Sequence, residues 1–402
     1  MGVVSLYFSL FVRAEVGADR ADGVYGVVSA ISMGLIFILS PALGAMTDRA
    51  RRRMPFLVGA TLICVAGTAL IGTGPFALSI GLFILANAAY QAGVQFYDSL
   101  LPEVTHAGNR GRISGIGVGV GYLGSYIAVG AGFLIAPDNH PALFGLLAAA
   151  FLLFALPCFF FVRERGNPTP RQVFSWNALR ASAGETVRTL KASRDFPGLA
   201  RFLIGRVFYT DAINTVISYM GLYTVNVALA TGLSPAEGRT QAQLVLMSAI
   251  SCSVVGGLAW GFAVDRFGPK RTLTTVLQLW IGVFALAAAV GAFALPILWL
   301  YVVAGLAGIA LGGIWAADRP FMLRLSPPDR IGEFYGLYGM VGRFSAITGP
   351  LLWAAIVYVV VDRGGLPTLT GQAMAICSLL AMTIVGYVIL RPVSDQPPGA
   401  PL

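Results

Sequence analysis

The stretch that decides the fold is Gly44-Ala-Met-Thr-Asp-Arg-Ala-Arg-Arg-Arg53, which lies at the end of a long apolar run. A second copy, Gly261-Phe-Ala-Val-Asp-Arg-Phe-Gly-Pro-Lys-Arg271, stands 217 residues later and also follows an apolar run. Both copies place an Asp-Arg pair four residues after a glycine. Two more landmarks repeat in the same order at an offset of 220 residues, namely Asp98 with Asp318 and Arg110 with Arg330. The chain is therefore predicted to consist of two copies of one structural unit.

The composition predicts an integral membrane protein. Of the 402 residues 57% are hydrophobic and only 11% are charged, whereas soluble domains carry about 25% charged residues. A helix needs about 20 apolar residues to cross a bilayer. Eleven apolar runs approach or exceed this length, at residues 23–46, 56–74, 76–96, 113–136, 142–162, 202–228, 241–264, 272–294, 297–317, 334–361 and 371–390. They lack the alternation of barrel strands, so we predict an all-α membrane protein with eleven full spans.

The first apolar run is too short to cross a membrane. Residues 2–12 form a largely apolar run of eleven residues, about half of a span. The run has neither a basic start nor a small-residue cleavage site, so it does not resemble a secretory signal. We expect it to be the outer half of a partial first span, and we hypothesise that the natural protein begins further upstream.

The basic residues predict the orientation of the chain. The connections on the side of residues 47–55 hold 21 of the 27 Lys and Arg residues. The other side holds Arg13, Arg20, Arg239 and Arg363. Because cytoplasmic connections carry the excess of basic residues, this asymmetry places residues 47–55 in the cytoplasm. We expect a multi-pass protein of the plasma membrane, in bacteria the inner membrane.

The longest connection divides the chain into two parts. Residues 1–162 are expected to form an N-terminal six-helix bundle with an incomplete first span, and residues 202–391 a C-terminal six-helix bundle. Residues 392–402 are expected to form a cytoplasmic tail. Within the linker, residues 163–201, apolar side chains recur at helical spacing, at Trp176, Leu179, Ala183, Val187 and Leu190. This pattern favours an amphipathic helix on the inner membrane surface, and a solvated linker is the alternative.

The repeated signature resembles that of the major facilitator superfamily. Three further stretches resemble its "unknown major facilitator" branch, which includes the autophagy-related vacuolar amino-acid effluxers: residues 96–125, 208–216 and 329–350. The resemblance implies two six-helix bundles that alternate access to a site between them. It implies a monomer that transports a small polar organic solute, with amino acids suggested by analogy, and that uses a coupling proton or cation. A non-transporting sensor or assembly factor on the same fold is the alternative.

By the same resemblance, the acid of the signature meets the N-terminus of a span in the opposite half and latches a cytoplasmic gate. A carboxylate is favourable there because the helix dipole is positive at its N-terminus. The predicted gate residues are Gly44, Asp48, Arg49, Arg52, Arg53, Gly261, Asp265 and Arg266. The alternative is that these basic clusters only fix the orientation of the loops.

Polar residues within spans are the candidates for solute binding, because a polar group in a bilayer is costly. In the run 76–96, three amides recur at intervals of four residues, which places them on one helix face. The resemblance assigns spans four and seven to the central cavity. The predicted cavity residues are Asn87, Gln91, Gln95, Tyr209, Asp211, Asn214, Thr215, Ser218 and Arg343. The alternative for such residues is hydrogen bonding between helices.

Asp211 is the single residue on which the prediction depends most. It is an acid inside an apolar run and inside a stretch that matches the branch. It could bind a cation, carry a coupling proton or pair with an amine of the solute. It could also neutralise Arg206 or Arg343, although Arg206 lies about 140° away round an ideal helix.

Several other functions are disfavoured. The run Gly119-Val-Gly-Tyr-Leu-Gly124 fits a dinucleotide fingerprint, but it lies within a span and is better explained by close helix packing. The two histidines lie in connections, and the four cysteines are dispersed among apolar runs. This pattern disfavours a metal site and a membrane-embedded enzyme. We expect no cofactor and no nucleic-acid partner.

Overall fold

The computed structural model describes residues 7–8, 11–12, 14–16, 18–106, 108–135, 139–166, 197–327 and 330–394. Every regular element within these ranges is helical, as predicted. The elements are α2 (Ala18–Arg49), α3 (Met54–Ala69), α4 (Phe76–Ser99), α5 (Leu101–Val104), α6 (Arg110–Leu134), α7 (His140–Phe161), α9 (Pro197–Ala230), α10 (Pro235–Phe267), α11 (Pro269–Ala292), α12 (Leu298–Leu325), α13 (Ile331–Val357), a π-helix (Tyr358–Arg363) and α14 (Thr368–Leu390).

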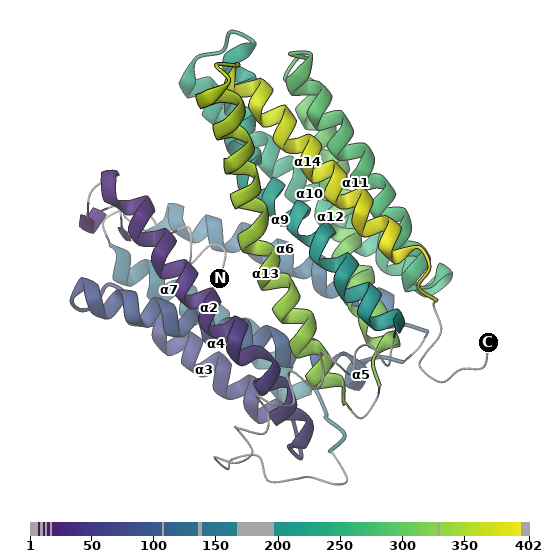
Figure 1. The fold of residues 1–402 in the computed structure, drawn as a ribbon. Helices are drawn as coiled ribbons and strands as arrows, with labels where there is room; N and C mark the ends of the chain where they lie inside the picture. Colours follow the sequence, from purple (N-terminus) through teal and green to yellow (C-terminus); the bar gives the residue numbers. More distant parts are fainter. Residues whose placement is uncertain are drawn as a thin grey trace. The chain divides into compact units, whose positions relative to one another are not determined.

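Each of the eleven predicted apolar runs coincides with one long helix (Figure 1). Among the described residues, seven helices are long and apolar enough to cross a membrane. An eighth is obtained if the bent pair within α2, Val27–Ser40 and Ala42–Arg49, forms one span. The full count of eleven spans stays a prediction. The amphipathic linker helix also stays a prediction, because its residues from Trp176 to Leu190 lie outside the described part.

Prolines and one strong cap explain why several helices begin where they do. Proline stands in the first turn of α3, α5, α7, α10 and α11, where its missing N–H costs nothing. At α10, the Ser234 hydroxyl accepts a bond from the Glu237 N–H, and the Glu237 carboxylate accepts one from the Ser234 N–H. Gly268 ends α10 with a φ of 85°, a conformation that favours glycine.

The chain divides into two compact units. The first unit contains Met1–Thr105, Leu123–Lys191 and Pro327–Met340. The second contains His106–Tyr122, Ala192–Ser326 and Val341–Leu402. The first turns of α13 therefore belong with the first unit, and the first turns of α6 belong with the second.

Aromatic side chains fill the core of the first unit. Helix α3 packs against α4 and α7, and α2 packs against α4. Phe8, Phe11, Phe83 and Phe144 are buried together between these elements, and the ring of Phe8 stacks on that of Phe83 at a centroid distance of 3.9 Å. The described part of the first apolar run is thus packed against helices α4 and α7.

Small residues bring the helices of the second unit close together. Helix α10 packs against α12 and α9, and α11 packs against α12 and α14 (Figure 1). A Cβ atom at Gly308 would overlap the carbonyl oxygen of Ala249, and one at Gly312 would overlap the backbone of Gly257. Close contact between glycine-rich helix faces is typical of membrane bundles, where van der Waals packing stabilises association.

Candidate functional site

A buried ion pair joins α9 to α12 in the second unit. The Nε of Arg206 donates to Oδ2 of Asp318 at 2.8 Å, and the hydroxyl of Tyr209 donates to Oδ1 at 2.5 Å. All three side chains are at most 3% exposed. The Arg206 guanidinium thus neutralises the buried Asp318 carboxylate, and the Tyr209 hydroxyl donates a further hydrogen bond to it. A buried charge is costly without such partners. Among the contacts that the structure describes, Arg206 therefore pairs with Asp318.

Asp211 lies near the middle of α9 and contacts α13. Its Oδ1 accepts a hydrogen bond of 2.7 Å from the backbone N–H of Gly349, and its Oδ2 accepts one from the hydroxyl of Thr348. Pro350 follows directly in α13. Because proline disrupts the helical bonding of the preceding turn, the Asp211 carboxylate meets α13 at a weakened point.

The other candidates on α9 differ in their surroundings. Thr215 is fully buried beside Gly349, whereas Asn214 is half-buried. Ser218 is exposed and donates to the carbonyl oxygen of Asn214 within its own helix. The side chain of Arg343 lies outside the described part of the structure, so its predicted role is not addressed by the geometry.

The amide stripe of α4 faces α2. Asn87 donates to the Ser32 hydroxyl at 2.9 Å, and Gln95 donates to the Ser40 carbonyl at 2.8 Å. Gln91, which is half-buried, contacts the sulfur of Met33. These contacts correspond to the alternative of hydrogen bonding between helices, since Asn87 and Gln95 are at most 4% exposed.

The first copy of the signature caps α13. Oδ1 of Asp48 accepts a bond of 2.8 Å from the N–H of Gly332, in the first turn of that helix. Arg53 donates to the same Asp48 oxygen at 2.8 Å and to the carbonyl of Ser99 at 3.2 Å. A Cβ atom at Gly44 would overlap the carbonyl oxygen of Gly332. The glycine therefore permits the approach, and the aspartate binds the helix end.

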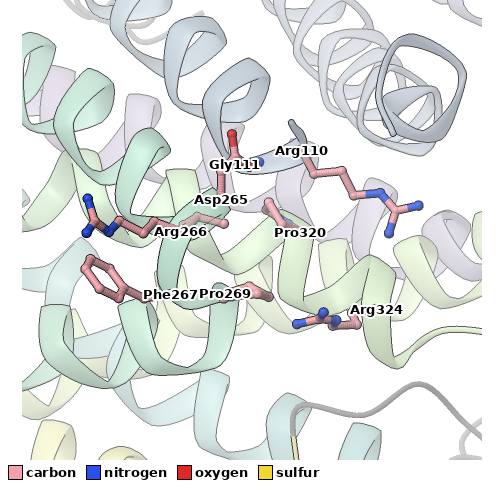
Figure 2. Close-up of a pocket in the computed structure, with 10 residues that line it drawn as sticks. Arg110, Gly111, Asp265, Arg266, Phe267, Pro269, Pro320 and Arg324 are labelled. Carbon is pink, nitrogen blue, oxygen red and sulfur yellow. Dashed lines mark hydrogen bonds between the residues drawn. The ribbon is translucent and has the colours of Figure 1, made fainter. Parts of the chain in front are cut away.

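The second copy caps α6 in the same way. The carboxylate of Asp265 accepts two bonds, from the N–H of Gly111 at 2.6 Å and from the N–H of Arg112 at 2.9 Å. Figure 2 shows Asp265 beside Gly111 at the start of that helix. A Cβ atom at Gly261 would lie 2.9 Å from the Gly111 carbonyl oxygen. The glycine and the aspartate thus perform the same two tasks as in the first copy.

The two copies differ in their basic residues. Lys270 occupies the position equivalent to Arg53, but its ammonium group donates to the carbonyl of Arg391 at 3.0 Å. Arg266 extends over the ring of Phe267, and Arg52 is exposed. Only the first copy therefore supports its aspartate with an ion pair among the described contacts. In the second copy, the Asp265 carboxylate accepts two backbone bonds.

A cavity of about 320 Å³ opens beside Asp265. Its lining includes Arg110, Arg266 and Arg324, which give it a positive charge. In Figure 2, Arg110 and Arg266 extend to opposite sides of Asp265. The cavity lies at the end of α10, so it adjoins the capping contact and not the buried cluster of Asp211.

The glycine-rich face of α6 packs against α10. A Cβ atom at Gly115 would overlap the carbonyl oxygen of Gly257, and one at Gly119 would lie 3.4 Å from that of Val254. Of the three fingerprint glycines, Gly119 takes part in this packing, whereas no atom lies within 4 Å of the Cβ positions of Gly121 and Gly124.

Sequence reasoning did not assign a site role to Asp318, Thr348 or Gly349. Asp318 was recognised only as a repeat landmark, although it is an acid beside an apolar run that could have been matched with Arg206. The Gly-Pro pair at residues 349–350 was a signal for a weakened helix. The sequence contains no local sign that Asp211 would face that point.

Comparison with known proteins places this arrangement among transporters. The chain matches the protein family described as vacuole effluxer Atg22 like over residues 20–395. It is 25% identical to the uncharacterized MFS-type transporter YxiO of Bacillus subtilis (strain 168), over 97% of this chain and 89% of that protein. It is 26% identical to autophagy-related protein 22-1 of Aspergillus niger, over 63% of this chain and 43% of the fungal protein.

Solved structures show the same fold. The human organic anion transporter MFSD10 aligns with a TM-score of 0.70 and 16% identity, over 97% of this chain and 90% of that chain. The proton:xylose symporter XylE, bound to 6-bromo-6-deoxy-D-glucose, aligns with a TM-score of 0.66 and 14% identity, over 98% and 95%. The architecture is therefore that of a major facilitator, a multi-pass membrane protein.

Proposed function

Because the chain belongs to the vacuole effluxer Atg22-like family of transporters, we propose that it moves a small polar organic solute by alternating access. Amino acids are the proposed solutes, and a proton or cation is the proposed coupling ion. We further propose eleven full spans and a partial first span, two six-helix bundles, a monomeric state and a location in the bacterial plasma membrane.

The observation that carries this proposal is the pair of capped helix ends. Asp48 accepts the N–H of Gly332, and Asp265 accepts the N–H of Arg112, at positions that correspond in the two repeats. A carboxylate at a partly exposed helix N-terminus contributes only about 0.3–1 kcal/mol, and up to about 2 kcal/mol when partly buried. Contacts of this strength can break and reform during a transport cycle, so they suit a cytoplasmic latch.

The alternating model assigns different tasks to the two groups of residues. Gly44, Asp48, Arg53, Gly261 and Asp265 hold the latch. The proposed solute path lies beside Asp211 and its neighbours, where polar groups are buried within apolar helices. Residues that bind the solute and residues that open the path are therefore separate, as rigid-body transport about a fixed site requires.

Binding and counterflow measurements test the proposal. Purified full-length protein is screened against the twenty amino acids by thermal unfolding, since a bound solute raises apparent stability by mass action. Proteoliposomes are then loaded with each solute that binds, and uptake of the labelled solute is followed. We expect counterflow for the solutes that stabilise the protein. Solute binding without counterflow would instead favour the alternative, a non-transporting sensor or assembly factor on the same fold.

The variant Asp211→Asn refines this test. It keeps the volume of the side chain and an oxygen that can accept the Gly349 N–H, but it removes the charge. We expect normal expression and loss of transport. Thr224→Val is the matched control, because Thr224 is a buried polar residue of the same helix whose hydroxyl donates to the Met220 carbonyl. Unimpaired transport by Asp211→Asn would remove this carboxylate from the mechanism.

A further inference from the structure

The contacts of Asp211 form a small anion site within α13. Thr348 and Gly349 lie inside the continuous helix α13, directly before Pro350, whose missing N–H and ring disturb the bonding of the preceding turn. These two residues supply two donors, the Thr348 hydroxyl and the Gly349 N–H, and both bind the Asp211 carboxylate.

A third donor lies at the same place without an acceptor. Thr215 is fully buried, and its hydroxyl has no hydrogen-bond partner among the described residues. This hydroxyl is directed at Gly349, because a Cβ atom there would overlap it. Buried polar groups without a partner are rare in native structures and call for an explanation. The carboxylate of Asp211 uses two of the three donors.

The absence of a side chain at residue 349 keeps this site open. A Cβ atom at Gly349 would overlap the Asp211 carboxylate as well as the Thr215 hydroxyl. A carboxylate can therefore reach the backbone N–H of residue 349, beside the hydroxyls of Thr215 and Thr348, only if this residue is glycine. The site is thus defined by Thr215, Thr348 and Gly349, and Asp211 is the anion that occupies it in this structure.

We propose that Thr215, Thr348 and the Gly349 N–H form the subsite for the carboxylate of the transported solute, and that Asp211 is a resident anion which the solute displaces. This inference rests on the proposed transport function and narrows the solute class to carboxylates. The resident anion satisfies the donors while the site is empty of solute. A solute carboxylate that replaces it reaches all three donors, including the Thr215 hydroxyl.

The test replaces the resident anion by a small carboxylate. Thermal unfolding of Asp211→Ala and of the wild type is measured with sodium formate at constant ionic strength, with sodium chloride and formamide as controls. We expect formate to raise the midpoint of Asp211→Ala saturably, and to leave the wild type unchanged. Formamide and chloride should stabilise neither protein. A midpoint of Asp211→Ala that does not respond to formate overturns the proposal.

A second comparison tests the third donor. In the Asp211→Ala background, Thr215→Val should weaken the apparent affinity for formate about five-fold, the effect of one hydrogen bond. Thr224→Val is the matched control, because Thr224 is equally buried on α9 but donates to the Met220 carbonyl in its own helix. We expect this control to leave the formate affinity unchanged. Equal formate affinities of Asp211→Ala, Asp211→Ala/Thr215→Val and Asp211→Ala/Thr224→Val would contradict a role for Thr215.

If Asp211→Ala does not fold without formate but folds with it, the formate dependence itself supports the proposal. If it folds under neither condition, Thr215→Val is examined in the wild-type background, where both Asp211 bonds remain. The probe is then the amino acid with the largest thermal shift, compared with its amide. We expect Thr215→Val to weaken binding of the acid about five-fold, and equal binding overturns the proposal.

The outcomes separate the subsite from the transport function, because formate binding requires no transport. Formate binding to Asp211→Ala without counterflow of any amino acid would support the anion site and reject the proposed function. Counterflow without formate binding would support the function and reject the subsite.

Discussion

Gly44 and Gly261 begin the two copies of the signature because a facing backbone passes directly over each of them. The Gly332 carbonyl covers Gly44, and the Gly111 carbonyl covers Gly261. The aspartate four residues later lies on the same side of the helix, one turn further along, because 3.6 residues complete a turn. The spacing of the signature is thus a consequence of helix geometry.

Gly44→Ala should destabilise the protein. The new Cβ would meet backbone that cannot rotate away, and overpacking of this kind costs about 1–3 kcal/mol. Gly34→Ala on the same helix is the control, because no atom lies within 4 Å of its Cβ position. The control should gain up to about 1 kcal/mol from helix propensity. Chemical or thermal unfolding in detergent measures both, and equal stabilities would contradict the close contact.

The ion pair between Arg206 and Asp318 predicts a non-additive mutational effect. Arg206→Met alone leaves a buried carboxylate without its charge partner and should cost about 3–5 kcal/mol. The double variant Arg206→Met/Asp318→Leu removes both charges and should be more stable than the single variant. The free energy of unfolding of each variant checks this. A double variant less stable than Arg206→Met would show that the pair is not the dominant interaction.

Tyr209→Phe tests the remaining bond to Asp318. The substitution removes only the hydroxyl that donates to this carboxylate. A hydrogen bond to a charged group contributes about 1.5–3 kcal/mol, and we expect a loss of that size in the free energy of unfolding. Tyr219→Phe is the control, because Tyr219 also lies in α9 and its ring stacks on Trp353 of α13. We expect this control to be nearly neutral.

At the scale of helices, the N-termini are capped in two different ways. The N-termini of α6 and α13 are capped by acids from distant segments, whereas α10 is capped by its own Ser234 and Glu237. A local cap forms with the helix, but a distant cap depends on tertiary contact. The beginnings of α6 and α13 are therefore expected to respond to changes elsewhere in the molecule.

Asp265→Ala should loosen the start of α6. The variant leaves the N–H groups of Gly111 and Arg112 without their acceptor, so these amides should open more often. Hydrogen exchange followed by mass spectrometry should show faster exchange in peptides that cover residues 110–114, and unchanged exchange at the start of α11. Protection equal to the wild type at α6 would show that the cap does not hold this helix.

At the scale of the whole molecule, the duplicated signature and the charge asymmetry describe the same organisation. The capping contacts recur at equivalent positions of the two repeats, which supports the duplication seen in the sequence. The 21 basic residues on one predicted side of the membrane include those of both signatures. The proposed latch and the proposed cytoplasmic face therefore coincide.

Cysteine labelling tests the predicted orientation. In a variant whose four native cysteines are replaced by alanine, Thr231→Cys and Arg271→Cys place single thiols at exposed positions on opposite predicted sides. A membrane-impermeant maleimide should label Thr231→Cys in intact cells, and Arg271→Cys only after permeabilisation. The reverse pattern would reject the orientation.

The sequence predicted helix positions well and side-chain partners less well. Eleven apolar runs coincide with eleven long helices, because hydrophobic patterning is a property of consecutive residues. The signature and its copy also indicated the family, which the match over residues 20–395 shows. In contrast, the sequence left two roles open for the amides of α4, a solute path and bonds between helices. The structure gives Asn87 and Gln95 hydrogen-bond partners on α2, and their role in a path stays a prediction.

The sequence by itself therefore determined the class of protein, the location of its helices and its membership in a transporter family. Only the tertiary structure decided which polar groups meet, because the partners are distant in the chain. Asp48 and Gly332 are separated by 284 residues, and Asp211 and Gly349 by 138. The local sequence shows that a charged residue lies within an apolar helix. The packing of the helices determines which partner compensates that charge.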